Sequence, residues 1–518
     1  MTILAPLVRE LNSTVMLASW QSVPPVYRLS QDVLQYIWEM GTWESDSGKE
    51  NIIFPLKVSQ VCRSWRALAI ATPTLWTVIS LLGEHQGSDY FQQQQSLARS
   101  KNCSLTVFVD LGYVQYDENE SGIYTYDTLD SSFPSLAHIA RLLKPHVSRI
   151  QTFTVLADDN TIAYFFLRRT GRQDMPKLKC LDVMVDTSNG FNGFSMPQIQ
   201  DSLDLLPQEC APALKSLSLS GVHLFWPSTL YTGLTSLTIS HMDLGQRPST
   251  HELGELLSST AQSLEYLELR DADPSDWEDA PVIHEEDRIV LPNVLELVLG
   301  YSRPEGAALV LKLFHYPKMQ KLTMRDMEYD FSDDDSGRIL GPDASCVMRA
   351  LTAQNSLPSV DFLVLQGMCM PSTDNASKLL NAFHALKTLE INGCSSSFLQ
   401  ALALAPPVAF ELSEHSPTSV LPSLLCLSLR NLSIIDMEYR KVVKMLRTRK
   451  AAGEKAHVPK FDYLSVVWDR CPFVVDVRFP SRLLAYSIDV YYVDVPAPKP
   501  FRPWSARWGV APRSALWY

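Results

Sequence analysis

The sequence of 518 residues predicts an α/β protein in two parts. A small three-helix bundle is expected over residues 23–80, followed by an irregular solenoid of strand–helix repeats over residues 100–492. A short apolar pattern that recurs ten times along the chain predicts the solenoid, and two apolar stripes near the start of the chain predict the bundle.

The recurring pattern is an apolar residue, two further residues, a leucine, one further residue and a second apolar residue. Its ten copies begin at Leu178, Leu214, Leu234, Leu264, Val294, Met319, Val360, Leu386, Leu424 and Phe461, and a weaker eleventh begins at Ile150. Seven copies have a proline two residues ahead. Proline ends a helix and favours extended backbone beside it, and apolar residues spaced two apart indicate a strand with one buried face. Each copy therefore predicts a strand.

Stretches with helical spacing lie between the copies, for example over residues 251–258, 306–315, 375–383 and 439–446. One strand and one helix cannot bury their apolar faces alone, so neighbouring units must stack. We therefore expect a horseshoe with parallel strands on its concave side and helices on its convex side. Acidic loops such as 271–279 are expected to lie in solvent.

Three short helices are predicted ahead of the repeats. Ser30 can cap the first helix, and an apolar stripe follows over residues 33–40. After a polar insert at 41–51, a second stripe runs over residues 58–69. A Thr-Pro pair at 72–73 predicts the start of the third helix.

Residues 493–518 form a tail rich in proline, tryptophan and arginine. Proline favours an extended backbone, and the ends of a solenoid need covering. We expect the tail to lie along the last repeats as a cap. The alternative is an arm that inserts into a partner or a membrane surface.

The charge balance, the cysteine pattern and the apolar runs of the chain argue against several classes of protein. The 45 basic and 57 acidic side chains give a formal net charge of −12, which argues against nucleic acid as the main partner. The nine cysteines are spread singly without a zinc-ligand spacing, which fits a reducing compartment. The first twenty residues do not match a secretory signal, and no apolar run reaches the roughly 18 residues of a membrane span. We expect a cytoplasmic or nuclear protein without a membrane partner.

Sequence motifs of common enzymes are missing. The chain contains no GxGxxG, GxxxxGK[ST], GxSxG or HExxH. We therefore expect a non-catalytic protein without a cofactor or a metal centre.

Two segments resemble known families. The runs LSQDVLQYIW and PLKVSQVCRSWRALAIATPTLW, which fall within residues 29–76, resemble an F-box, although Ser30 stands where that family usually has proline. The recurring pattern resembles the leucine-rich repeat, L-x-x-L-x-L-x-x-N/C, but only the copy at Leu386 carries the last residue, as Cys394. An F-box followed by leucine-rich repeats is the order found in substrate receptors of SCF-type ubiquitin ligases.

The resemblance implies that the bundle binds a Skp-type adaptor, and through it a cullin scaffold, while the repeats bind a protein target for ubiquitination and degradation. The adaptor contacts it implies are Leu29, Val33, Leu34, Ile37, Trp38, Val61, Cys62 and Trp65. The chemistry would take place on other subunits. In the alternative reading, the bundle is only a structural cap on a repeat scaffold and does not bind the adaptor.

A sparse basic column is predicted on the concave face. Residues that alternate with the buried pair are small and hydroxylic in the early repeats, whereas later repeats contribute Arg270, Lys321, Arg325 and Arg430. Arginine forms forked hydrogen bonds with carboxylates and phosphates, so this column is expected to bind an acidic segment of the target. The alternative is that these are solvated charges partnered by Glu268 and Glu390.

Overall fold

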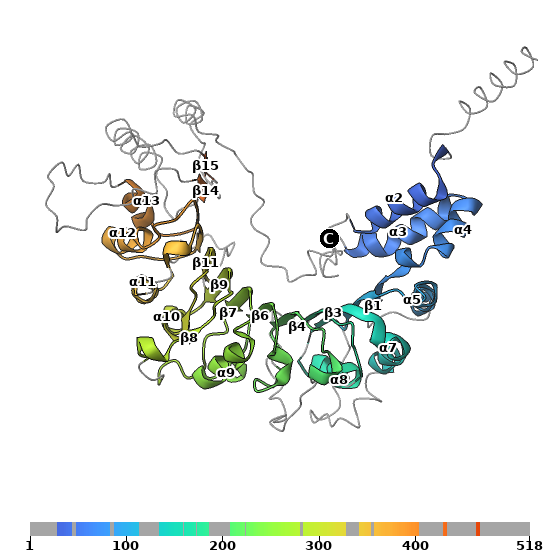
Figure 1. The fold of residues 1–518 in the computed structure, drawn as a ribbon, viewed down its shortest axis with the longest axis horizontal. Coiled ribbons are helices and arrows are strands. Elements are labelled where there is room, and N and C mark those ends of the chain that lie inside the picture. The colour runs from blue at the N-terminus through green and yellow to red at the C-terminus, as the bar shows by residue number, and fades with distance from the viewer. Residues whose placement is uncertain are drawn as a thin grey trace, which may run out of the picture.

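Figure 1 shows the fold in a computed structural model. The structure describes residues 28–43, 48–82, 88–112, 134–158, 160–171, 173–185, 208–222, 224–279, 283–327, 341–353, 357–403, 428–432 and 463–466. In these ranges the chain is an α/β protein built on one large, open parallel sheet, which confirms the predicted α/β class. The predicted tail at 493–518 lies outside the described residues.

Thirteen strands of the described ranges form the sheet, side by side in chain order, and every neighbouring pair is parallel. They are β1 (Val78–Leu82), β2 (Leu105–Asp110), β3 (Ile150–Ala157), β4 (Cys180–Val185), β5 (Ser216–Ser220), β6 (Ser236–Ser240), β7 (Tyr266–Arg270), β9 (Glu296–Tyr301), β11 (Lys321–Asp326), β12 (Phe362–Gln366), β13 (Thr388–Asn392), β14 (Ser428–Leu432) and β15 (Tyr463–Val466). A separate parallel pair joins β8 (Ile289–Val290) to β10 (Phe314–His315).

Helices supply many of the connections that parallel neighbours require. The α-helices are α5 (Ser88–Arg99), α7 (Pro134–Leu143), α8 (Asn160–Gly171), α9 (Thr250–Thr260), α10 (Pro304–Leu313), α11 (Ser345–Thr352), α12 (Thr373–Asn381) and α13 (Ser396–Ala403). Short 3-10 helices are η3 (Lys144–Arg149), η5 (Gln208–Cys210), η6 (Thr229–Tyr231), η7 (Leu244–Gln246), η8 (Glu285–Asp287) and η9 (Leu357–Ser359). α9, α10 and α12 confirm the helices expected over 251–258, 306–315 and 375–383, whereas 439–446 lies outside the described residues.

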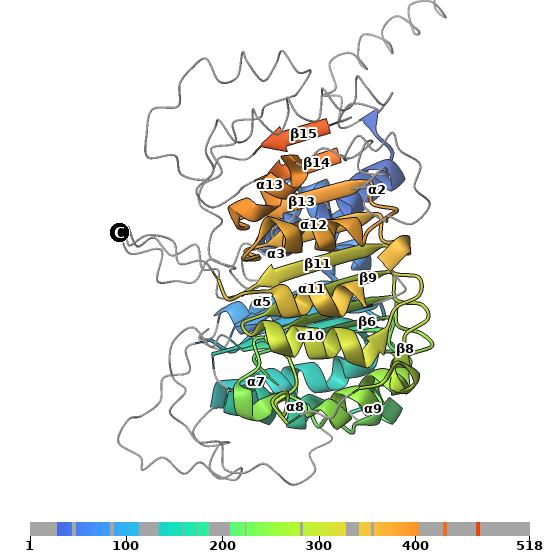
Figure 2. The same ribbon diagram turned by 90° about the vertical axis from the view of Figure 1, so that its left-hand side faces the viewer.

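The sheet curves into an arc, with the α-helices on its outer side (Figure 1). Figure 2 shows α10, α11, α12 and α13 stacked in chain order outside the strands. We call the side of the sheet that faces away from these helices the inner face.

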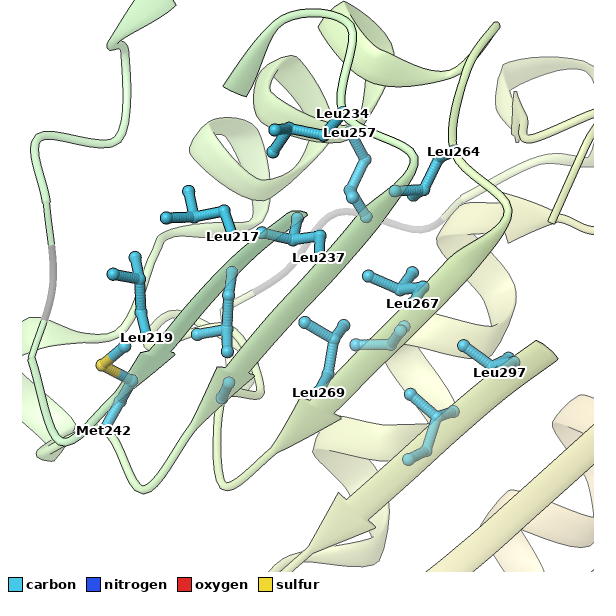
Figure 3. Packing of buried hydrophobic residues seen from close by; sticks show 14 of the residues in the cluster. Leu217, Leu219, Leu234, Leu237, Met242, Leu257, Leu264, Leu267, Leu269 and Leu297 are labelled. Carbon is cyan, nitrogen blue, oxygen red and sulfur yellow. The ribbon is translucent and has the colours of Figure 1, made fainter. Parts of the chain in front are cut away.

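Rows of aligned apolar side chains form the core between the sheet and the outer helices (Figure 3). The leucine of the recurring pattern lies opposite its equivalent on the next strand throughout β4 to β13. This row is Leu181, Leu217, Leu237, Leu267, Leu297, Leu322, Leu363 and Leu389, and each member is at most 2% exposed. The strands predicted from these eight copies are therefore confirmed.

One predicted strand is displaced. At the copy that begins at Leu424, the residue opposite Leu389 is Leu429 and not the expected Leu427. β14 is therefore shifted by two residues relative to the recurring pattern. A shift of two preserves which side chains face the core, so the alternation of faces gave no sign of it.

The sheet begins earlier than expected. β1 starts at Val78, inside the range 23–80 assigned to the bundle, and β2 pairs with it before the copies of the pattern begin. Neither strand carries the recurring pattern, although β2 alternates buried Leu105, Val107 and Val109 with less buried residues. The period-2 alternation over 105–109 was the signal that could have identified it.

The helices that precede the sheet are α2 (Gln31–Trp43), α3 (Gly48–Val61), α4 (Arg63–Ala71) and the 3-10 helix η2 (Pro73–Trp76). Ser30 Oγ accepts a hydrogen bond from the amide of Val33 at 3.3 Å, so the predicted helix cap is confirmed. The helices share a small core made of Leu34, Trp38, Val58, Ala69, Leu75 and Trp76.

The second predicted stripe spans two helices rather than one. Cys62 has an extended backbone with φ −157°, and its Sγ accepts the amide of Trp65 at 3.4 Å as the cap of α4. α3 also begins at Gly48, inside the predicted polar insert. The break at Cys62 was hidden because the apolar spacing continues across it.

A buried arginine joins α5 to the strand that follows η3. The guanidinium of Arg149 donates to Leu97 O at 2.9 Å, Ser100 Oγ at 2.8 Å and Cys103 O at 3.2 Å, and the residue is 8% exposed. These acceptors lie at the carboxyl end of α5, where carbonyl groups lack helical partners and a positive charge is favourable.

Replacing Arg149 with methionine is expected to lower the free energy of unfolding by about 3 kcal/mol, because two buried acceptors and one partly buried acceptor lose charged donors. Thermal and urea unfolding of the full chain measure the change. Arg141→Met is the matched control, because Arg141 is exposed and its Nε donates only to Ala137 O, one turn earlier on the same helix. Equal melting of both variants would contradict this role for Arg149.

Candidate interaction surfaces

An exposed apolar row lies along one face of α2 and includes Leu29, which lies just ahead of the helix. Its members are Leu29, Val33, Tyr36, Ile37 and Met40, which follow helical spacing and are between 39% and 63% exposed. We call these five residues the α2 ridge. Apolar side chains that gather on one exposed helix face commonly mark a protein-binding surface.

Two of the predicted adaptor contacts are core residues. Leu34 and Trp38 lie one turn apart on the other face of α2 and are 8% and 3% exposed. They pack in the core that α2 shares with α3, α4 and η2. In the chain without a partner these two side chains are therefore core residues, and their contact with an adaptor stays a prediction. The spacing revealed an apolar stripe but not which of its edges faces inward.

The other predicted contacts divide into exposed and structural positions. Leu29, Val33, Ile37 and Val61 are exposed. Cys62 caps α4, and Trp65 is half-buried with its ring centroid 5.0 Å from that of Trp38. The exposed positions can contact a partner without any change in the fold of the helices.

Hydroxyl groups line the early part of the inner face. Because Leu217 and Leu237 point into the core, the residues that alternate with them face the other way. On β5 and β6 these are Ser216, Ser218, Ser220, Ser236, Thr238 and Ser240. The prediction that these small, hydroxylic residues lie on the face opposite the buried leucines is confirmed.

Acidic neighbours neutralise two members of the predicted basic column. Arg270 forms an ion pair with Glu268, whose carboxylate also accepts the hydroxyl proton of Tyr266. Lys321 Nζ lies 2.7 Å from a carboxylate oxygen of Glu296 on the neighbouring strand. The alternative of a partnered charge therefore holds for Arg270, and Lys321 has a partner that the sequence did not suggest. Arg430 lies opposite Glu390 in the register of β13 and β14.

Arg325 differs from these neighbours. It is half-buried on β11 and, among the described residues, forms no ion pair or hydrogen bond. Burial and the nearby Arg270 guanidinium lower the pKa of Arg325, while Asp271 and Glu268 oppose that change. Of Arg270, Lys321 and Arg325, whose side chains the structure describes, Arg325 is the one without an ion pair or hydrogen bond.

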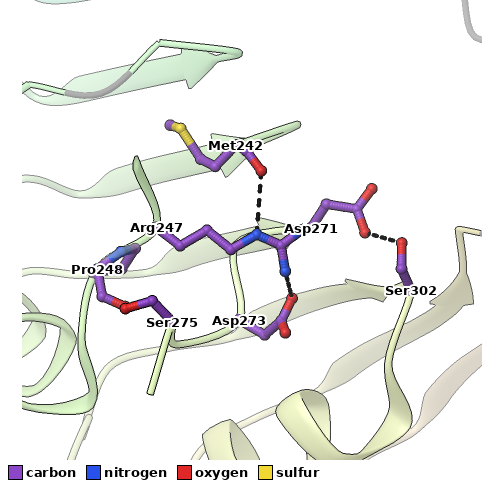
Figure 4. Close-up of polar contacts among 7 residues, drawn as sticks. All are labelled: Met242, Arg247, Pro248, Asp271, Asp273, Ser275 and Ser302. Carbon is purple, nitrogen blue, oxygen red and sulfur yellow. Dashed lines mark hydrogen bonds and ion pairs between the residues drawn. The ribbon is translucent and has the colours of Figure 1, made fainter. Parts of the chain in front are cut away.

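The acidic loop after β7 is built into the fold instead of lying in solvent (Figure 4). Arg247 pairs with Asp273, and its Nε donates to Met242 O at 3.1 Å. Asp271 accepts the hydroxyl proton of Ser302 at 2.5 Å. Burial raises the pKa of Asp273, and Arg247 opposes this rise. The expectation that residues 271–279 are solvated is wrong for these two carboxylates, because Arg247 approaches from a loop that sequence spacing did not bring near.

A second buried charge faces inward on β4. Asp182 is 8% exposed, and both of its carboxylate oxygens are buried. Burial raises the pKa of Asp182 to about 6, and the Ser218 side chain on the next strand opposes the rise only in part. The carboxyl group therefore holds its proton more tightly in the folded chain than in the unfolded chain.

The described residues contain no group of three or more His, Cys, Asp or Glu side chains placed to hold a metal ion. Within the same ranges, no helix combines the length and the apolar character that crossing a membrane requires.

No family model matches the chain, and no curated protein matches it. Two surfaces of the described residues remain as candidates for function, the α2 ridge and the inner face. The ridge is apolar, whereas the inner face carries hydroxyls and charges, so the two surfaces suit different partners.

Asp182→Asn is expected to stabilise the chain at neutral pH. The folded-state pKa of about 6 lies above the ordinary value of 3.8, so stability is highest below the unfolded value and falls as pH rises towards 6. Removing the charge should restore up to about 3 kcal/mol at pH near 7 and almost nothing at pH near 4.

Thermal unfolding of wild type and variant at the two pH values measures this effect. Asp174→Asn removes a charge from an exposed residue and serves as the control. A stabilisation by Asp182→Asn that is the same at both pH values would exclude the titration of this carboxyl as its cause.

Proposed function

We propose that the chain is the substrate-recognition subunit of an SCF-type ubiquitin ligase. The helices within residues 31–76 correspond to the segment that resembles an F-box, and the strands of the arc correspond to degenerate leucine-rich repeats of a solenoid. In this proposal, the helices bind a Skp-type adaptor and the inner face binds a protein target. Ubiquitin transfer takes place on other subunits of the ligase.

The observation that carries the proposal is the α2 ridge. Val33 and Ile37 are 44% and 46% exposed, although both are large apolar side chains. Their exposure costs free energy that a partner can recover by covering them. The ridge lies in the stretch of sequence that resembles an F-box. We therefore assign a Skp-type adaptor as its partner.

The location of the ridge also suits a receptor. α2 lies at one end of the arc, whereas the inner face extends along the strands that follow (Figure 1). A receptor has to hold adaptor and target at the same time, which requires two separate surfaces. A concave array of parallel strands offers an extended surface for binding another protein.

One observation favours the alternative of a structural cap. Trp76 in η2 is 2% exposed, and the Arg99 guanidinium of α5 lies 4.4 Å from its ring centroid. The helices therefore pack against the first elements of the sheet, as a capping unit would. Capping and adaptor binding use different sides of the helices, and only adaptor binding needs the α2 ridge.

Substituting the ridge separates these two functions. The double variant Val33→Asp, Ile37→Asp is expected to lose adaptor in co-purification of the full chain with a Skp-type adaptor. Somewhat less than half of each side chain is exposed, so covering the pair contributes about 2 kcal/mol to binding, and its loss lowers the affinity roughly thirtyfold. Both positions are exposed, and the thermal midpoint should stay close to that of wild type.

Leu244→Asp provides the control, because Leu244 is 56% exposed in η7, far along the chain from the helices. It should leave adaptor recovery unchanged. Equal recovery of adaptor with wild type and the ridge variant, both folded, would exclude the ridge as the docking surface and leave the structural cap.

A further inference from the structure

Three neighbouring strands bring two arginines together on the inner face. Arg270 of β7 and Arg325 of β11 lie opposite Gly300 of β9, one on each side. Neighbouring strands are about 4.8 Å apart, so about 10 Å separates the two Cα atoms. Arginine side chains are long enough for both to reach one anion placed between these strands.

Gly300 lets the side chains of Arg270 and Met327 lie directly against the backbone of β9. A Cβ atom at this position would lie 2.9 Å from Cγ of Arg270 and 2.8 Å from Sδ of Met327, which is too close for packed atoms. His241, at the end of β6, lies beside Arg270 and donates its backbone amide to Arg270 O at 2.9 Å. We call His241, Arg270, Gly300 and Arg325 the Arg325 notch.

The acidic groups around the notch are already engaged. Glu268 is paired with Arg270, and Asp271 accepts a hydrogen bond from Ser302. Arg325 is left half-buried with no hydrogen bond or ion pair among the described residues. A guanidinium group carries five N–H donors, and partial burial removes water that would otherwise satisfy them. An incoming anion would supply the missing acceptors.

We propose that the Arg325 notch binds an anionic side chain, a phosphate ester or a carboxylate, presented by a peptide segment of the target. This inference rests on the proposed function and specifies the chemistry of the target. Arg325 supplies the forked hydrogen bonds. Arg270, which is paired with Glu268, lines the other side of Gly300.

The other basic residue of this region is less suited to the task. Lys321 is held by Glu296 at 2.7 Å, and its Nζ lies 5.4 Å from the ring centroid of Phe362. An anion at Lys321 would have to displace a carboxylate that is already in place. Selection for negative charge should therefore depend on Arg325 much more than on Lys321.

The test uses fluorescent peptide pools of identical degenerate sequence whose central residue is fixed as phosphoserine, glutamate or serine. Binding to the full chain is measured by fluorescence anisotropy, with wild type, Arg325→Met and Gly300→Val. Arg349→Met is the matched control, because Arg349 is exposed on the outer helix α11. Thermal unfolding establishes that each variant is folded.

Wild type and Arg349→Met should bind the phosphoserine or the glutamate pool at least about tenfold more tightly than the serine pool. Arg325→Met should abolish this preference, and Gly300→Val should reduce it by displacing the Arg270 side chain that lies over Gly300. The charged pool that binds more tightly identifies the source of the anion.

Equal binding of all three pools by wild type, or a preference retained by folded Arg325→Met, would overturn the proposal. The peptide assay contains no adaptor, so its result does not depend on whether the α2 ridge binds one. Failure of the notch likewise leaves adaptor recovery intact.

Discussion

The in-register rows of leucine behind the sheet are the constraint on which the rest of the structure depends. Each strand buries its leucine only because an equivalent leucine lies opposite on both neighbours, as Leu237 does between Leu217 and Leu267. A single unit has no such neighbours and could not bury its apolar face. Because side chains alternate along a strand, burying the leucines on one face places the intervening residues on the inner face. Burial on one side thus presents hydroxyls and charges on the other.

The same reasoning explains the two faces of α2. Helical periodicity sends Leu34 and Trp38 into the small core and leaves Val33 and Ile37 outside. The helices have little core of their own, and Trp76 ties them to α5 through its contact with Arg99. Packing against the first elements of the sheet therefore stabilises the helices that precede it, while the α2 ridge remains available for a partner.

The sequence predicted the strands well because burial imposes a strict spacing that ten copies repeat. It predicted the charged positions of the inner face but not their partners. Glu296 reaches Lys321 from another strand, and Gly300 separates Arg270 from Arg325, so both relations depend on the register between strands. The break at Cys62 and the early strands β1 and β2 were missed for a different reason. The apolar spacing continues through the break at Cys62, and β1 and β2 do not carry the recurring pattern.

The central claim is that the helical module offers one surface to an adaptor while the inner face stays free for a target. Hydrogen–deuterium exchange of the full chain, with and without a Skp-type adaptor, tests it most directly. The account predicts that adaptor slows exchange in peptides covering α2 and leaves those covering β5 to β12 unchanged. Protection of the inner strands, or no protection of α2 at saturating adaptor, would contradict it.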